Sequence, residues 1–128
     1  MVRTERNTLI VDAYNANPSS MEVALKNFAA LQADHKMALL GDMLELGEDS
    51  LAEHVRIAEM ASGAGFDKVC FVGQEFRKAL TQLQIEDSLV FDTSSDLAQW
   101  LDKEHPAGYA LLIKGSRGTR MEKVIEML

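Results

Sequence analysis

The fold is decided by residues 9–21, which read LIVDAYNANPSSM in one-letter code. The first three residues are aliphatic and predict a buried strand that ends at Asp12. Asn17 is a good N-cap and Pro18 a good first helical residue, because an N–H at that position has no intrahelical partner to lose. Ser19 and Glu22 offer a second, overlapping capping box. A helix N-terminus after a polar turn suits anions and nucleotides, although an ordinary well-capped turn would have the same features.

The composition is ordinary for one soluble globular domain spanning residues 1–128, with 47% hydrophobic and 26% charged residues. The net charge is −7, and no basic stripe is present, so nucleic acid is not an expected partner. The only cysteine, Cys70, lies in an apolar run and is expected to be an inert core residue in a reducing compartment. No apolar stretch approaches the ~20 residues of a membrane span. We therefore expect a cytoplasmic protein without a membrane partner.

Short apolar segments alternate with segments of helical spacing along the whole chain. The predicted strands are residues 2–5 (an edge strand), 9–11, 37–40, 68–72, 89–91 and 109–113. Helices are predicted between them, the first over residues 19–34, and a last one ends the chain. This alternation indicates βαβ units. The fold class is therefore α/β, with a doubly wound, mainly parallel sheet of five to six strands and helices on both faces.

Serine or threonine followed three residues later by an acidic residue predicts the start of each of three later helices. The pairs are Ser50 with Glu53, Thr93 with Asp96, and Thr119 with Glu122. For the helix that starts at Ser50, the spacing predicts a buried face. The members of that face are Leu51, Val55, Ala58 and Ala61. His54 lies one turn into this helix, where a lone histidine is typical of a surface or packing position.

Three unusual loops begin where a predicted strand ends, at residues 12–20, 41–49 and 114–119. Parallel strands bring such loops to one edge of the sheet, where α/β proteins bind ligands. Gly115 and Gly118 would allow positive φ and close backbone approach to a ligand. Neither a G-x-x-x-x-G-K-[ST] phosphate loop nor a G-x-G-x-x-G fingerprint is present. The edge therefore offers side chains that can bind a ligand but no recognisable catalytic motif. Taken alone, it looks like half of an active site. Its side chains are Asp12, Tyr14, Asn15, Asn17, Asp42, Glu45, Lys114, Ser116 and Arg117.

The three loops carry the motifs DAYNANP (residues 12–18), LGDMLELG (40–47) and LIKGSRG (112–118). In this order they resemble the C-terminal, Rossmann-like domain of the Mur ligases, and they span nearly all of the chain. The first motif is similar to the form found in members that add D-alanyl-D-alanine to UDP-N-acetylmuramoyl-tripeptide in peptidoglycan synthesis. The resemblance implies that this chain is one of three domains of a longer ligase.

In that family the central domain holds the ATP phosphate loop, the magnesium ions and most catalytic groups, and the N-terminal domain binds UDP. The tripeptide carboxylate is phosphorylated by ATP, and the dipeptide amine attacks the acyl phosphate. The resemblance implies that this domain closes over ATP and the dipeptide, has no catalytic residue of its own and is inactive alone. It further implies roles for individual residues. Asp12, Tyr14, Asn15 and Asn17 would contact the adenosine part of ATP; Lys114, Ser116 and Arg117 would face the dipeptide and the developing charge; Asp42, Glu45 and His54 would line the cleft.

Two other classes of function compete with a ligase domain. A receiver-type phosphoacceptor domain also has five strands, and Asp12, Thr93 and Lys114 follow its pattern. However, the predicted strand 68–72 ends in Gly73 without an acceptor aspartate, and a phosphodonor assay would separate the two. The third possibility is a non-catalytic interaction module, in which the acidic loop binds a protein.

Overall fold

The computed structural model describes residues 2–12, 16–85 and 89–128. It forms a single six-stranded sheet in the order β1-β2-β6-β3-β4-β5. Only β1 is antiparallel to its neighbour, and the other pairs are parallel. The strands are β1 (Val2–Arg3), β2 (Thr8–Asp12), β3 (Lys36–Gly41), β4 (Lys68–Val72), β5 (Leu89–Phe91) and β6 (Ala110–Lys114). The predicted edge strand and the mainly parallel sheet are confirmed.

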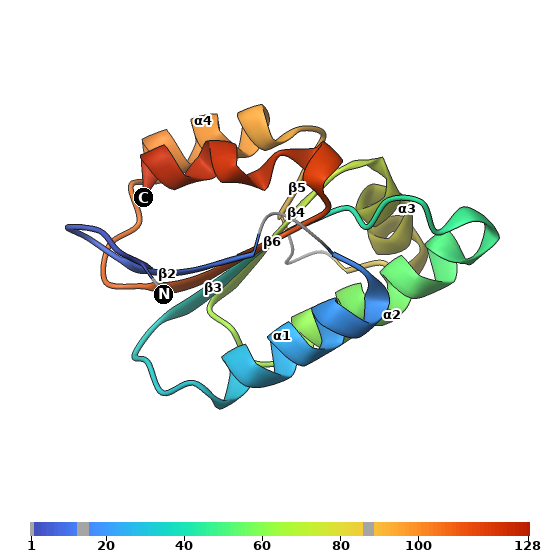
Figure 1. Ribbon diagram of the computed structural model, residues 1–128, viewed down its shortest axis with the longest axis horizontal. Coiled ribbons are helices and arrows are strands. Elements are labelled where there is room, and N and C mark those ends of the chain that lie inside the picture. Colours follow the sequence, from blue (N-terminus) through green and yellow to red (C-terminus); the bar gives the residue numbers. More distant parts are fainter. Residues whose placement is uncertain (1, 13–15, 86–88) are drawn as a thin grey trace.

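Helices cover both faces of this sheet (Figure 1). One face carries α1 (Pro18–Ala30), α2 (Ser50–Ser62) and α3 (Gln74–Leu83). The other carries α4 (Ser94–Glu104) and the 3-10 segment η3 (Met121–Met127), and two shorter 3-10 turns are η1 (Gly47–Asp49) and η2 (Arg117–Thr119). Within β3, Ala38 and Leu40 enter the first core and Met37 and Leu39 the second, because successive strand residues point to opposite faces. The doubly wound α/β class is therefore confirmed.

The first and fourth helices begin as predicted. Asn17 caps α1, with the Ser20 N–H donating to its Oδ1 at 2.9 Å. The capping box is closed by Ser20, whose Oγ accepts from the Asn17 N–H at 3.0 Å, and not by the predicted pair of Ser19 and Glu22. Thr93 caps α4 by accepting from the Asp96 N–H at 3.1 Å. The first helix ends at Ala30, four residues before the predicted end.

The second helix differs from the prediction in its start and in its buried face. The turn η1 precedes it, so that Ser50 is its first residue and Asp49 is its N-cap, which makes no side-chain capping bond. Its buried residues are His54, Ile57, Ala58 and Ala61. Leu51 is 40% exposed. The buried face is thus rotated about the helix axis relative to the predicted one. Hydrophobic spacing alone did not indicate this rotation, because the buried face includes a histidine.

The C-terminal segment is not the predicted capped α-helix. The pair of Thr119 and Glu122 forms no capping box, and the segment Met121–Met127 is 3-10 helical. It follows Arg120, which has a φ of +52° and leads the chain out of η2. Its apolar residues Met121 and Val124 are nevertheless buried as expected. Across the described part of the chain, no helix combines the length and apolarity that a membrane crossing requires.

Candidate functional site

The carboxyl ends of β2, β6 and β3 lie side by side, and the three unusual loops leave from them. In the sheet register, Lys114 of β6 is paired with Asp12 of β2 on one side and with Leu40 of β3 on the other. The predicted convergence of the loops on one edge is therefore confirmed. Tyr14 and Asn15 lie outside the described residues.

Ser116 joins all three loops. Its N–H donates to the Asp42 carbonyl at 3.1 Å. Its hydroxyl accepts from the Leu44 N–H at 2.9 Å and donates to the Ala16 carbonyl at 3.2 Å. The residue is 8% exposed. In this conformation its hydroxyl fixes the loops to one another instead of pointing to an open surface.

Gly115 and Gly118, which flank Ser116 and Arg117, allow close packing around this loop. Neither Gly115 nor Gly118 uses the positive φ that a glycine allows. A Cβ on Gly115 would lie 2.7 Å from Met121 Cγ, and one on Gly118 would lie 2.6 Å from Leu44 Cδ1. The chain's own side chains therefore occupy the space that these glycines leave.

Asp42 caps a helix that starts 32 residues later. The Glu75 and Phe76 N–H groups in the first turn of α3 each donate to its carboxylate at 3.0 Å. Asp42 is 5% exposed, and this burial raises the pKa of its carboxyl, although the two N–H bonds oppose the shift. Gly73, the N-cap residue of α3, has a φ of +119°, and a Cβ there would lie 2.2 Å from Asp42 Oδ2.

His54 lies beneath the acidic loop and does not line an open cleft, because its side chain is 0% exposed. Its Nδ1 lies 2.7 Å from the Ser50 carbonyl, to which it donates. Its Nε2 accepts from the Met43 N–H at 3.0 Å. These two partners assign the neutral tautomer with the proton on Nδ1 and explain why a polar ring can be buried here. His54 thus stabilises the acidic loop from its buried side, through the bond to the Met43 N–H.

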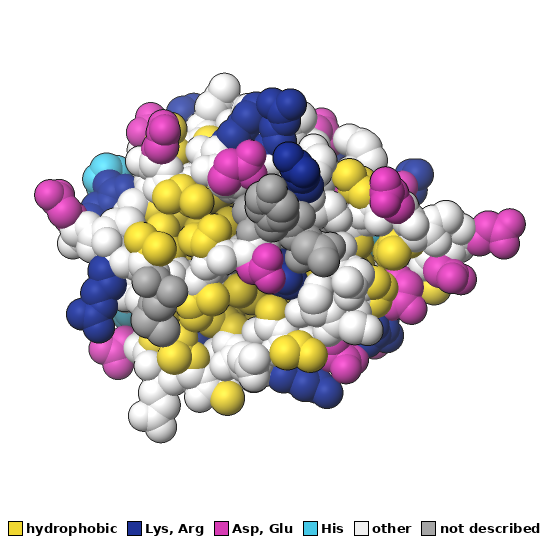
Figure 2. Space-filling model, viewed as in Figure 1, with side chains coloured by type: hydrophobic (Ala, Val, Ile, Leu, Met, Phe, Trp, Pro, Cys, Tyr) yellow, Lys and Arg dark blue, Asp and Glu magenta, His cyan; other side chains and the backbone are white. Residues whose placement is uncertain are grey.

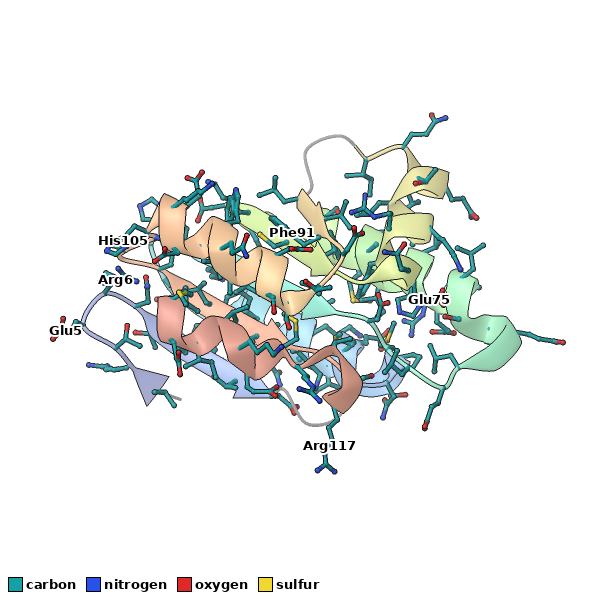
Figure 3. The ribbon with its side chains drawn as sticks, turned by 90° about the horizontal axis from the view of Figure 1, so that it is seen from above. Glu5, Arg6, Glu75, Phe91, His105 and Arg117 are labelled. Atoms are coloured by element: carbon teal, nitrogen blue, oxygen red, sulfur yellow. The ribbon has the colours of Figure 1, made fainter. Side chains whose placement is uncertain are left out.

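Hollows of about 460, 380 and 760 Å³ open at this edge, and the first lies beside Asp42 and Gly73. A crevice of about 380 Å³ is lined by Asn17, Glu45, Ser116 and Arg117 from the three loops. Arg117 is exposed and projects away from the body of the molecule (Figure 3). A groove of about 760 Å³ runs between the sheet and α1, with Asp12, Asn17 and Lys114 among its lining residues. Figure 2 shows hydrophobic side chains gathered on this face of the molecule. Those that line the groove are Ile10, Val23, Ala24, Phe28, Leu31 and Leu112.

Lys114 is buried at the wall of the groove and forms an ion pair with Asp12. The distance between Lys114 Nζ and Asp12 Oδ2 is 2.5 Å. The lysine side chain is 1% exposed, whereas the aspartate side chain is 51% exposed. Lys114 thus lies beside Asp12 at the groove between the sheet and α1.

The described residues contain no group of three or more His, Cys, Asp or Glu side chains that could hold a metal ion. The capping role of Asp42 and the linking role of Ser116 were not predicted. The only sequence signal for the capping role of Asp42 was Gly73, the N-cap residue of α3, which has no side chain with which to cap the helix itself. The linking role of Ser116 depends on contacts between loops far apart in the sequence, which no local pattern reveals.

Comparisons with known proteins agree with this architecture. Residues 1–117 match the family model of the Mur ligase glutamate ligase domain. The chain is 33% identical over 124 residues to UDP-N-acetylmuramoyl-tripeptide--D-alanyl-D-alanine ligase of Escherichia coli, covering 97% of this chain and 27% of that protein. It is 34% identical over 125 residues to the ligase of the same name from Treponema pallidum, covering 94% and 27%.

Solved structures show the same similarity. A crystal structure of MurF from Acinetobacter baumannii superposes with a TM-score of 0.81 at 29% identity, covering 98% of this chain and 28% of that one. MurF ligase from Thermotoga maritima in complex with ADP gives a TM-score of 0.80 at 25% identity, with 98% and 29% covered. This chain thus spans little more than a quarter of the proteins it matches. The match over residues 1–117 and the shared fold identify it as a C-terminal (glutamate ligase) domain, and the chain belongs to the Mur ligase family.

Proposed function

We propose that this chain is the C-terminal domain of a cytoplasmic, ATP-dependent ligase that joins D-alanyl-D-alanine to UDP-N-acetylmuramoyl-tripeptide. The observation that carries the proposal is the meeting of all three family motifs at one sheet edge, in a fold similar to MurF along 98% of the chain. The names of the curated relatives supply the substrates. The remaining parts of such a ligase, a central ATP-binding domain and an N-terminal UDP-binding domain, would be the partners of this edge.

The proposed nucleotide side is the mouth of the groove. Asp12 offers a half-exposed carboxylate there, and Asn17 lines the same space. Acceptors of this kind suit the hydroxyl groups of a nucleoside, and the apolar wall suits a flat base. We assign Asp12, Tyr14, Asn15 and Asn17 to contacts with adenosine. The ADP complex of the Thermotoga maritima MurF supports a nucleotide as the ligand of the complete ligase. The phosphate loop and Mg²⁺ would belong to the central domain.

The proposed dipeptide side is the crevice between the loops. Arg117 is exposed there, and its guanidinium suits the carboxylate of a dipeptide through two parallel hydrogen bonds. Glu45 lines the same crevice and suits an ammonium group. Asp42, His54 and Ser116 would act on the substrates indirectly, by holding these loops in place, because all three are buried.

The test is Arg117→Ala in the three-domain ligase that contains this chain. Loss of a charge-assisted contact is worth about 1.5–3 kcal/mol, so kcat/KM for the dipeptide should fall about ten-fold or more. The melting temperature should not change, because the side chain is exposed. Phosphate release that requires both the tripeptide substrate and D-alanyl-D-alanine measures the reaction.

Arg3→Ala is the matched control, because Arg3 is exposed and is paired with Thr8 at the far end of β2. Normal kinetics in both variants would contradict the assignment of Arg117. The chain of residues 1–128 alone is expected to release no phosphate from ATP, because it contains no phosphate loop. Reproducible turnover by the purified chain would contradict the proposal that it supplies only half of the site.

A further inference from the structure

The ion pair of Lys114 and Asp12 is built into the sheet. The two residues are register partners at the ends of the parallel strands β2 and β6, so the backbone ladder fixes the separation of their Cα atoms. Side chains two residues apart in a strand point to the same face, and Ile10 and Leu112 line the groove on that face. The ammonium of Lys114 is thus held where it can reach one oxygen of Asp12, at 2.5 Å.

The two partners differ in their access to solvent. The Lys114 side chain is 1% exposed and the Asp12 side chain 51% exposed. A buried ammonium is unfavourable unless a carboxylate or another acceptor compensates it. A half-exposed carboxylate, by contrast, has a choice of rotamers and of water partners. Lys114 narrows that choice, because its ammonium donates to one oxygen of the carboxylate at 2.5 Å.

We propose that Lys114 is a positioning residue for the nucleotide: it holds the Asp12 carboxylate at the mouth of the groove, ready to accept hydrogen bonds from the hydroxyl groups of adenosine. The inference rests on the proposed function, which puts Asp12 against the nucleotide. It reassigns Lys114, which the family resemblance placed against the dipeptide. Lys114 acts through Asp12, because its side chain is 1% exposed and its Nζ lies 2.5 Å from Oδ2 of that half-exposed carboxylate.

The experiment compares Lys114→Met with wild type in the three-domain ligase, measuring kcat and the separate KM values for ATP and for D-alanyl-D-alanine. We expect the KM for ATP to rise about ten-fold, the scale of one charge-assisted hydrogen bond, while the KM for the dipeptide stays within about two-fold. In the double variant with Asp12→Asn, Lys114→Met should add nothing to the effect of Asp12→Asn, since the same interaction is already lost.

Lys36→Met is the matched control. Lys36 begins the adjacent strand β3 and donates to the carbonyls of Phe28 and Ala29 near the end of α1. Its loss should lower stability and leave both KM values unchanged. This control separates a positioning effect on the nucleotide from a general loosening of the groove, which both variants would share.

A Lys114→Met variant that raises the KM for the dipeptide or lowers kcat, with a normal KM for ATP, would overturn the inference and return Lys114 to the dipeptide side. Additive effects in the double variant would also overturn it. If Asp12→Asn does not fold, the two KM values of Lys114→Met decide alone. A wild-type ligase that is active on these substrates while Lys114→Met is normal contradicts only this inference. A wild-type protein without dipeptide-dependent ligation contradicts the proposed function, and the inference falls with it.

Discussion

Replacing Asp42 by alanine should destabilise the domain far more than removing an ordinary helix cap. The carboxylate accepts from two N–H groups in the first turn of α3, those of Glu75 and Phe76, each at 3.0 Å. A hydrogen bond to a charged group contributes about 1.5–3 kcal/mol, and the alanine leaves a buried donor on Phe76 without its acceptor. Desolvation opposes the ionised carboxylate and outweighs the two bonds in setting its pKa, so the cost of the alanine comes mainly from the two N–H donors left without an acceptor. We therefore expect a loss of about 3 kcal/mol in the free energy of unfolding.

Urea unfolding of the chain, followed by circular dichroism, measures this loss. With a slope of about 1.5 kcal/mol per molar urea, the midpoint should fall by about 2 M. Thr93→Ala is the matched control, because Thr93 caps α4 through a single exposed bond, which is worth about 1 kcal/mol. Asp42→Asn should lie between the two, since it keeps one acceptor oxygen and turns an amide N–H₂ towards the other donor. If Asp42→Ala costs no more than Thr93→Ala, Asp42 does not act as the cap of α3.

Three further predictions concern caps, pH and the buried thiol. Asn17→Ala should lower the free energy of unfolding by about 1 kcal/mol, because the cap of α1 is lost. Asn17→Asp keeps the capping oxygen, so the melting temperature should not change, but the KM for ATP should rise in the complete ligase. A normal KM for ATP in Asn17→Asp would mean that Asn17 is only a cap. Because burial raises the pKa of Asp42, the folded chain retains a proton that the unfolded chain releases from about pH 3.8 upward, so this group's contribution to stability should fall as the pH rises through that window. Unfolding midpoints of wild type and Asp42→Asn across that range test the sign, since the variant cannot titrate there. Cys70 is 0% exposed and burial raises its pKa to about 12, so a thiol reagent at pH 8 should modify it only after unfolding, and rapid labelling of the native chain would contradict its burial.

The fold could be predicted from sequence because its signals are local. Short aliphatic runs placed the strands, and β4 at Lys68–Val72 and β5 at Leu89–Phe91 begin and end at the predicted residues. Asn17 and Thr93 were identified as caps because their hydrogen bonds stay within three residues. The errors arose where a tertiary contact overrode the pattern. The buried face of α2 includes His54, because Met43 and Ser50 provide hydrogen-bond partners for both nitrogens of its ring.

Only part of the site could be predicted from the sequence, because the rest of it depends on tertiary contacts. Sequence order and parallel strands sufficed to bring three loops to one edge, and the family motifs indicated which ligands to expect. They did not reveal which polar side chains face inward. Asp42 and Ser116 bind backbone groups of other segments, and Lys114 binds Asp12, at sequence separations of 33 to 102 residues. Such pairings depend on the packed structure, and a motif lists the residues without saying how they are divided between ligand and scaffold.

The position of β6 in the sheet has a consequence for how the chain acquires its structure. This strand is the last to be synthesised, yet it lies between β2 and β3 in the middle of the sheet. Until Ala110–Lys114 leaves the ribosome, β2 has only the two-residue β1 to pair with, and β3 lacks one neighbour. In the nascent chain, the position between β2 and β3 therefore stays unfilled until β6 is synthesised. Pairing of β6 with β2 joins segments about a hundred residues apart, and the formation of such distant contacts is slow. During that interval two unpaired strand edges are exposed to other chains, so aggregation during synthesis, more than in the finished domain, is where this topology is vulnerable.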